Sequence, residues 1–146
     1  MANVFDTAKY VLEKKGPLST MKLQKLCYYA QAWSLVWDDD ELFPEEFEAW
    51  ANGPVCRQLY DFHRGQYKIS AAQIHDGKLA GNLTDNQKDT IDHVLEHYGE
   101  KDAQWLSTLT HMEDPWQNAR KGYAPGELCN VVISKADMAE YYGSLG

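Results

Sequence analysis

The sequence predicts a mainly α-helical fold at the margin of the α+β class: a single compact domain over residues 1–146, with about five to seven helices and one small two-stranded β element. Three observations predict it. Apolar residues recur at helical spacing along most of the chain, between capping residues and Gly or Pro stops. Only residues 47–50 and 131–133 have the character of strands, and they can pair with each other. A length of 146 residues suits one core that needs no disulfide or metal.

Two helices are expected before the first strand. Residues 3–15 carry apolar side chains on one face, Asn3 can cap them, and a Gly-Pro pair stops them. Residues 20–37 form a second helical pattern whose opposite side, which includes Tyr28, is also apolar. A helix that is apolar on two faces is normally central and buried. The alternative is that its second face binds a partner.

A strand, a turn and a third helix are expected next. Residues 47–50 alternate between apolar and polar, as a half-buried strand does. The Asn-Gly-Pro that follows is typical of a turn that places Pro54 at the first position of a helix. That helix should bury Leu59 and end at Gly65. Residues 66–82 have weak periodicity, and we expect a long connection with a short strand or turn.

The second half of the chain predicts further helices. A capping box at Thr84 opens one helix, and Asp102 caps the next. A short helical segment begins at Asp114. Ser134 caps a final helix that should run to about Tyr142.

The net charge of −8, from 14 Lys and Arg against 22 Asp and Glu, disfavours a protein that coats nucleic acid. Residues 38–48 hold seven carboxylates and no basic residue. A solvated loop explains such a run, and complementarity to a basic partner is the alternative. No stretch approaches the roughly 20 apolar residues of a membrane span, and the N-terminus lacks a signal-peptide core. The three cysteines form no C-x-x-C pair, so we expect a cytoplasmic chain with reduced thiols.

Two groups of residues resemble catalytic motifs. His93, Glu96 and His97 spell H-x-x-E-H, the zinc signature of inverted zincins. The apolar face of their helix lies opposite to all three, so we expect them in solvent, with no metal and no cofactor. His111, near two carboxylates, could serve as a general base. We favour the alternative, in which His111 and Trp116 lock two helices together, and expect no enzyme.

Four segments carry a family resemblance. They are M-K-L-Q-K-L-C-Y-Y-A-Q-A-W at 21–33, F-E-A-W-A-N-G-P-V at 47–55 with Leu59-Tyr60, L-S-T-L-T-H-M-E-D-P-W at 106–116, and Ile133-Ser134 followed by Tyr141-Tyr142. In order and spacing they resemble the Panacea domain, a family of antitoxins of bacteria, phages and prophages. The E-A-W-x-x-G-P-V and T-H-x-x-D-P-W pieces are specific when taken together.

The resemblance implies a non-catalytic protein that neutralises a cognate toxin, encoded nearby, by direct contact. For one branch it also implies delivery of the toxin to an ATP-dependent protease. Trp50 and Trp116 should be largely buried, and truncation of either should cost about 3–5 kcal/mol. The motif residues are expected to be structural first: Leu23, Lys25, Leu26, Glu48, Trp50, Gly53, Pro54, Val55, Leu59, Thr110, His111, Asp114, Pro115 and Trp116.

The five Trp and nine Tyr exceed what a core of this size needs, so some aromatic residues should bind the partner. Helical phase favours Tyr10, Tyr28 and Tyr60, which leave the main buried stripes. Two other classes of function stay open. One is a metal- or His-dependent hydrolase that uses the histidines named above. The other is a DNA-binding regulator of its own operon that uses a locally basic N-terminal region: Lys9, Lys14, Lys15, Lys22 and Lys25.

Overall fold

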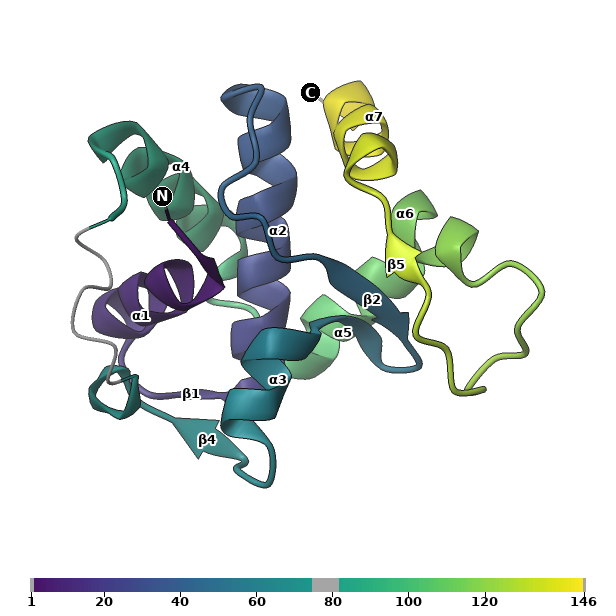
Figure 1. Ribbon diagram of the computed structural model, residues 1–146, viewed down its shortest axis with the longest axis horizontal. Coiled ribbons are helices and arrows are strands. Elements are labelled where there is room, and N and C mark those ends of the chain that lie inside the picture. The colour runs from purple at the N-terminus through teal and green to yellow at the C-terminus, as the bar shows by residue number, and fades with distance from the viewer. Residues whose placement is uncertain (1, 75–81, 146) are drawn as a thin grey trace.

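The computed structural model describes residues 2–74 and 82–145. These residues form mostly helices, with two small sheets (Figure 1), so the predicted fold class is confirmed. The helices are α1 (Val4–Lys15), α2 (Thr20–Trp37), α3 (Arg57–His63), α4 (Asp85–Tyr98), α5 (Ala103–His111), α6 (Asp114–Ala119) and α7 (Lys135–Leu145), with a 3₁₀ turn at Ala71–Gln73. The strands are β1 (Leu18–Ser19), β2 (Phe47–Trp50), β3 (Gly53–Cys56), β4 (Lys68–Ile69) and β5 (Val132–Ile133).

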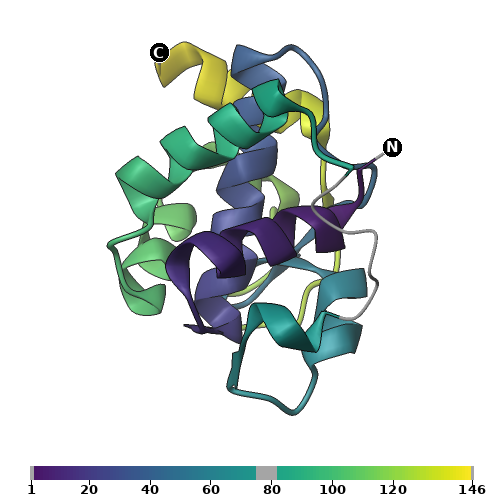
Figure 2. The ribbon, with the colours of Figure 1, turned by 90° about the vertical axis from the view of Figure 1, so that its left-hand side faces the viewer.

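Helix α2 lies at the centre of the fold. Helices α1, α4, α5 and α7 all pack against it, as the two perpendicular views show (Figures 1 and 2). Residues on opposite sides of α2, such as Leu26 and Tyr28, are therefore fully buried. The expectation of a central helix is confirmed.

Side-chain caps set the starts of the helices. Asn3, Thr84, Asp102 and Ser134 each accept a hydrogen bond from the backbone N–H three residues ahead. These bonds satisfy donors that have no partner within the helix. All four predicted caps are confirmed, and α7 continues to Leu145, beyond its expected end.

A buried polar cluster holds α7 in place. The hydroxyls of Tyr29 on α2 and Tyr142 on α7 each donate to Glu113 Oε1 over 2.7 Å. Burial raises the pKa of Glu113 above its ordinary value, although both tyrosine hydrogen bonds favour its ionised form. The cluster joins the C-terminal helix to the centre of the molecule.

The strands form two antiparallel sheets. The larger has the order β3-β2-β5, with Phe47 opposite both Cys56 and Ile133, and the smaller pairs β1 with β4. The predicted strands at 47–50 and 131–133 are confirmed, and they pair with each other. The expectation that they are the only strands is wrong, because β1, β3 and β4 are strands as well. Strands β1 and β4 are each two residues long, which is too short for a sequence pattern to place them, although a short strand or turn was expected within 66–82.

Residues 53–56 form strand β3, so the expectation of Pro54 at the first position of a helix is wrong. Gly53 has a φ of +117°, which reverses the chain and places 53–56 antiparallel to β2. The helix begins only at Arg57. Leu59 is buried as predicted.

The acidic run 38–48 is only partly a solvated loop. Asp39 and Asp40 are exposed. Asp38, however, accepts hydrogen bonds from Asn86 and Thr90 of α4, and Glu41 lies 3.2 Å from Lys135 Nζ. These carboxylates join the loop to α4 and α7.

The expected connection at 66–82 contains β4 and the 3₁₀ turn, and its residues 75–81 lie outside the described part. The three cysteines, Cys27, Cys56 and Cys129, are free thiols and buried.

Candidate binding site on the hairpin

Side chains from the α5–α6 region fix one side of the β2–β3 hairpin. The carbonyl oxygens of four consecutive residues, 49–52, each accept a hydrogen bond from a different side chain. The donors are Arg120 Nη1 to Ala49 (2.9 Å), Trp116 Nε1 to Trp50 (2.8 Å), His111 Nε2 to Ala51 (2.9 Å) and Ser107 Oγ to Asn52 (2.6 Å). Because turn carbonyls otherwise depend on water, these donors hold the turn in one geometry.

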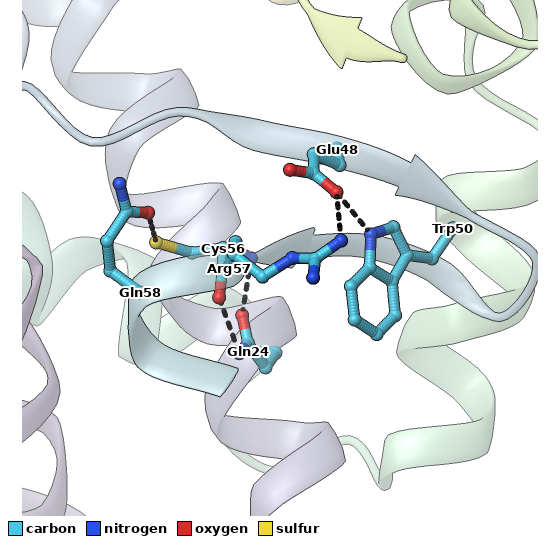
Figure 3. A network of polar contacts seen from close by, with 6 residues as sticks. All are labelled: Gln24, Glu48, Trp50, Cys56, Arg57 and Gln58. Carbon is cyan, nitrogen blue, oxygen red and sulfur yellow. Dashed lines mark hydrogen bonds and ion pairs between the residues drawn. The ribbon is translucent and has the colours of Figure 1, made fainter. Parts of the chain in front are cut away.

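Helix α2 fixes the outer edge of β3. The side-chain amide of Gln24 accepts from the Cys56 N–H (2.9 Å) and donates to the Cys56 carbonyl (3.2 Å), as a neighbouring strand would (Figure 3). Lys25 Nζ donates to the carbonyl of Pro54 over 3.2 Å. The family-like segments of α2, the hairpin and α5–α6 therefore meet at one place.

Lys25 is fully buried at this junction. Burial lowers its pKa from 10.5 to about 7. Its Cε lies only 2.6 Å from the position that a Cβ on Gly53 would take. Within the described residues no carboxylate forms an ion pair with it. Lys25 therefore stabilises the hairpin from inside the protein and presents no charge at the surface.

Stability should increase with pH because of Lys25. Its pKa is about 7 in the folded chain against 10.5 for an exposed lysine. Between these values the unfolded state binds more protons, so a rise in pH favours the folded state. Relative to Lys25→Met, the free energy of unfolding should rise by up to about 1.4 kcal/mol per pH unit above neutrality. Urea titrations of both proteins at several pH values from neutral to mildly alkaline measure this; a constant difference would contradict it.

The outer face of the hairpin carries a charged and aromatic cluster (Figure 3). Glu48 Oε1 accepts from the Trp50 indole N–H (2.7 Å) and from Arg57 Nη2 (3.3 Å). The Arg57 guanidinium lies 5.1 Å from the Trp50 ring centre, and the Tyr60 ring meets Trp50 edge-on at 4.8 Å. Strand alternation places Glu48 and Trp50 outward, since the other two residues of β2 are buried. The cluster is thus presented by a rigid hairpin.

A pocket of about 650 Å³ lies beside this cluster, and Trp50, Tyr60, Gln24 and His63 are among its lining residues. The Gln24 amide oxygen accepts from Cys56, so its Nε2 donates to His63 Nε2 over 3.0 Å. His63 is therefore neutral with its proton on Nδ1, and burial lowers its pKa.

The three tyrosines expected to bind a partner have different surroundings. Tyr60 is partly exposed beside the pocket. Tyr10 is 8% exposed and donates to Asp92 over 2.9 Å; burial and this carboxylate raise its pKa to about 12. Tyr28 is fully buried. The expectation that Tyr28 lies off the buried face is wrong, because neighbouring elements also cover the side of α2 on which Tyr28 lies.

The motif residues divide between the core and the hairpin contacts. Leu23, Leu26 and Leu59 are fully buried, Val55 and Pro115 are buried, and Asp114 is exposed at the start of α6. Thr110 is buried and donates to the Ser107 carbonyl. Trp50 and Trp116 are partly buried: a guanidinium lies against each ring, and Trp116 also packs against the hydrophobic core.

The histidine motifs do not form a catalytic arrangement. His93, Glu96 and His97 are exposed on α4, as predicted from helical phase. Both ring nitrogens of His111 lie against backbone carbonyls, those of Ser107 and Ala51. In the described part of the chain, no three His, Cys, Asp or Glu side chains are grouped to hold a metal.

Three of the five lysines in the locally basic N-terminal region are buried or lie against a carboxylate. Lys25 is buried, Lys15 pairs with Glu100, and Lys14 lies 4.0 Å from Asp92. This weakens the case for a DNA-binding regulator.

Three residues of the site were missed by the sequence reasoning: Gln24, Ser107 and Arg120. Arg120 is 6% exposed and also donates to the carbonyls of Ala124 (3.1 Å) and Glu127 (2.7 Å). All three bind backbone carbonyls, and such contacts leave no pattern in side-chain spacing. The available signal was that Gln24 and Ser107 lie within the family-like segments at 21–33 and 106–116.

The family model described as "Antitoxin SocA-like, Panacea domain" matches residues 23–117, more than half of the chain. The chain belongs to this antitoxin-like family. The matched region contains the hairpin, Gln24, Lys25 and the T-H-x-x-D-P-W segment. No match was found among curated proteins or among solved structures. Within the described residues, no helix is long and apolar enough to cross a membrane.

Proposed function

We propose that this chain is a single-domain, non-catalytic antitoxin that acts in the cytoplasm and neutralises a toxin encoded nearby by direct protein contact. Membership of the antitoxin-like Panacea family carries the proposal. The hairpin supports it: side chains of α2, α5 and the α6 region immobilise its backbone, while Glu48, Trp50 and Arg57 face outward. A rigid surface with Trp, Tyr and Arg side chains is typical of an interface that loses little entropy on binding.

Co-expression with the adjacent gene product tests the proposal. The wild-type chain should form a stable complex with it and restore growth. Tyr60→Ala should weaken the complex by about 30-fold or more, the effect of a hot-spot residue, and should abolish the growth rescue. Tyr67→Ala is the matched control, because Tyr67 is 81% exposed and lies outside the Trp50–Tyr60 cluster. Thermal unfolding should show that both variants stay folded.

A neighbour that is harmless alone and forms no complex would contradict the antitoxin function. The half-life of the toxin in cells with and without their ATP-dependent proteases separates two modes of neutralisation. A half-life that the antitoxin does not change indicates blocking. One that it shortens only when the proteases are present indicates delivery.

A further inference from the structure

The pocket beside the hairpin has the opposite charge balance from the rest of the chain. The protein has eight more carboxylates than lysines and arginines. The pocket is lined by two arginines, Arg57 and Arg64, and one histidine, and by no aspartate or glutamate. All of these lining residues belong to the described part of the chain. Charge therefore favours an anionic group here over a cationic one.

The two arginines have capacity for an additional acceptor. Arg64 is exposed, and within the described residues its guanidinium has no hydrogen bond or ion pair. Arg57 uses Nη2 for Glu48 and lies over Trp50, which leaves most of its five N–H donors. A carboxylate matches the planar guanidinium group, because its two oxygens can accept two parallel hydrogen bonds from it.

The rest of the lining is mainly apolar or already hydrogen-bonded. Trp50, Tyr60 and Val55 supply apolar surface, and Leu128 at the pocket is 90% exposed. The polar groups Gln24 and His63 bond to each other and to Cys56. They hold the pocket in shape, so the arginines, the exposed amides of Asn52 and Asn130 and the apolar surface are left to contact a ligand.

We propose, on the basis of the antitoxin function above, that this pocket binds an acidic and apolar segment of the partner protein. A carboxylate of that segment pairs with Arg57 and Arg64, and a neighbouring apolar side chain packs on Trp50, Tyr60 and Leu128. A basic segment would meet two guanidinium groups and no carboxylate in the lining; Glu48, next to Arg57, is already bonded to Arg57 and Trp50. Nucleic acid is a less suitable ligand, because the net charge of −8 on the chain disfavours the binding of phosphates to these two arginines.

The test titrates the full chain with two capped peptides while the indole N–H signals are followed by NMR. One peptide is acetyl-Leu-Asp-Phe-Glu-Leu-amide, and the other has Asn and Gln in place of Asp and Glu. The acidic peptide should bind at least about tenfold more tightly, the factor expected for one charge-assisted contact. It should shift the Trp50 signal, which is assigned from its loss in Trp50→Phe. The double variant Arg57→Gln and Arg64→Gln should lose this preference. The double variant Lys68→Gln and Lys121→Gln, which removes the same two charges at exposed residues outside the pocket, should keep it.

Equal binding of the two peptides, no binding of either, or an unchanged preference in the double arginine variant would overturn the proposal. A ten-nucleotide oligothymidylate that binds more tightly than the acidic peptide would overturn it in favour of nucleic acid. These outcomes are independent of the toxin. If the chain rescues growth but does not bind the acidic peptide, the proposal for the pocket is refuted. If the chain binds the peptide but forms no complex with the toxin, the antitoxin function is refuted.

Discussion

Gly53→Ala should lower the free energy of unfolding by about 2–6 kcal/mol. Two costs contribute. The φ of +117° is one that L side chains rarely adopt, and the new Cβ would stand 2.6 Å from Lys25 Cε and 3.0 Å from Thr110 Oγ1. Neither neighbour moves freely, because Lys25 and Thr110 are both buried. Urea denaturation measures the loss.

Gly126→Ala is the matched control for this substitution. Gly126 also has a positive φ, of +79°, but nothing lies within 4 Å of its would-be Cβ. It should therefore show the backbone cost alone, about 1–3 kcal/mol at most. If Gly53→Ala and Gly126→Ala destabilise equally, the close approach of Lys25 has no energetic consequence.

Arg120→Met should destabilise the chain by about 3–5 kcal/mol, the cost of leaving three backbone carbonyls without their charge-assisted donors. Arg120 donates to the carbonyls of Ala49, Ala124 and Glu127, and methionine keeps the apolar stem but none of these bonds. The hairpin and the segment that follows α6 would lose their common anchor. Chemical denaturation gives the change in stability, and hydrogen exchange shows where the backbone opens.

Arg64→Met serves as the comparison, since it makes the same change at an exposed arginine without an ion pair in the described residues. It should stay within about 0.5 kcal/mol of wild type. An Arg120→Met protein as stable as Arg64→Met would mean that the three carbonyl contacts contribute nothing.

The helices could be predicted because their signals are local. Asn3, Thr84, Asp102 and Ser134 cap the segments they precede, and apolar spacing marked the faces that α2 buries. Strand β3 could not be predicted in this way. Its sequence suits a helix start, and what makes it a strand is non-local: pairing with β2 and the amide of Gln24, 32 residues earlier in the chain.

The candidate site was predicted only in part. Tyr60 and the motif segments were identified, and the structure brings them to the same hairpin. Tyr28 was misplaced because helical phase separates two faces of a helix but does not say how many neighbours cover it. The four carbonyl contacts at residues 49–52 depend on the relative positions of separate elements, which no single segment encodes.

The amide of Gln24 has a consequence for how copies of this chain behave at high concentration. Strand β3 is the terminal strand on its side of the sheet, and an uncovered terminal strand is a template for aggregation. Here a glutamine side chain occupies the Cys56 N–H and carbonyl, and a lysine occupies the Pro54 carbonyl. A second molecule therefore finds no free backbone at these positions, and the sheet cannot be extended from this edge into a fibre. Two polar side chains of a buried helix thus protect this edge of the sheet from pairing with another molecule.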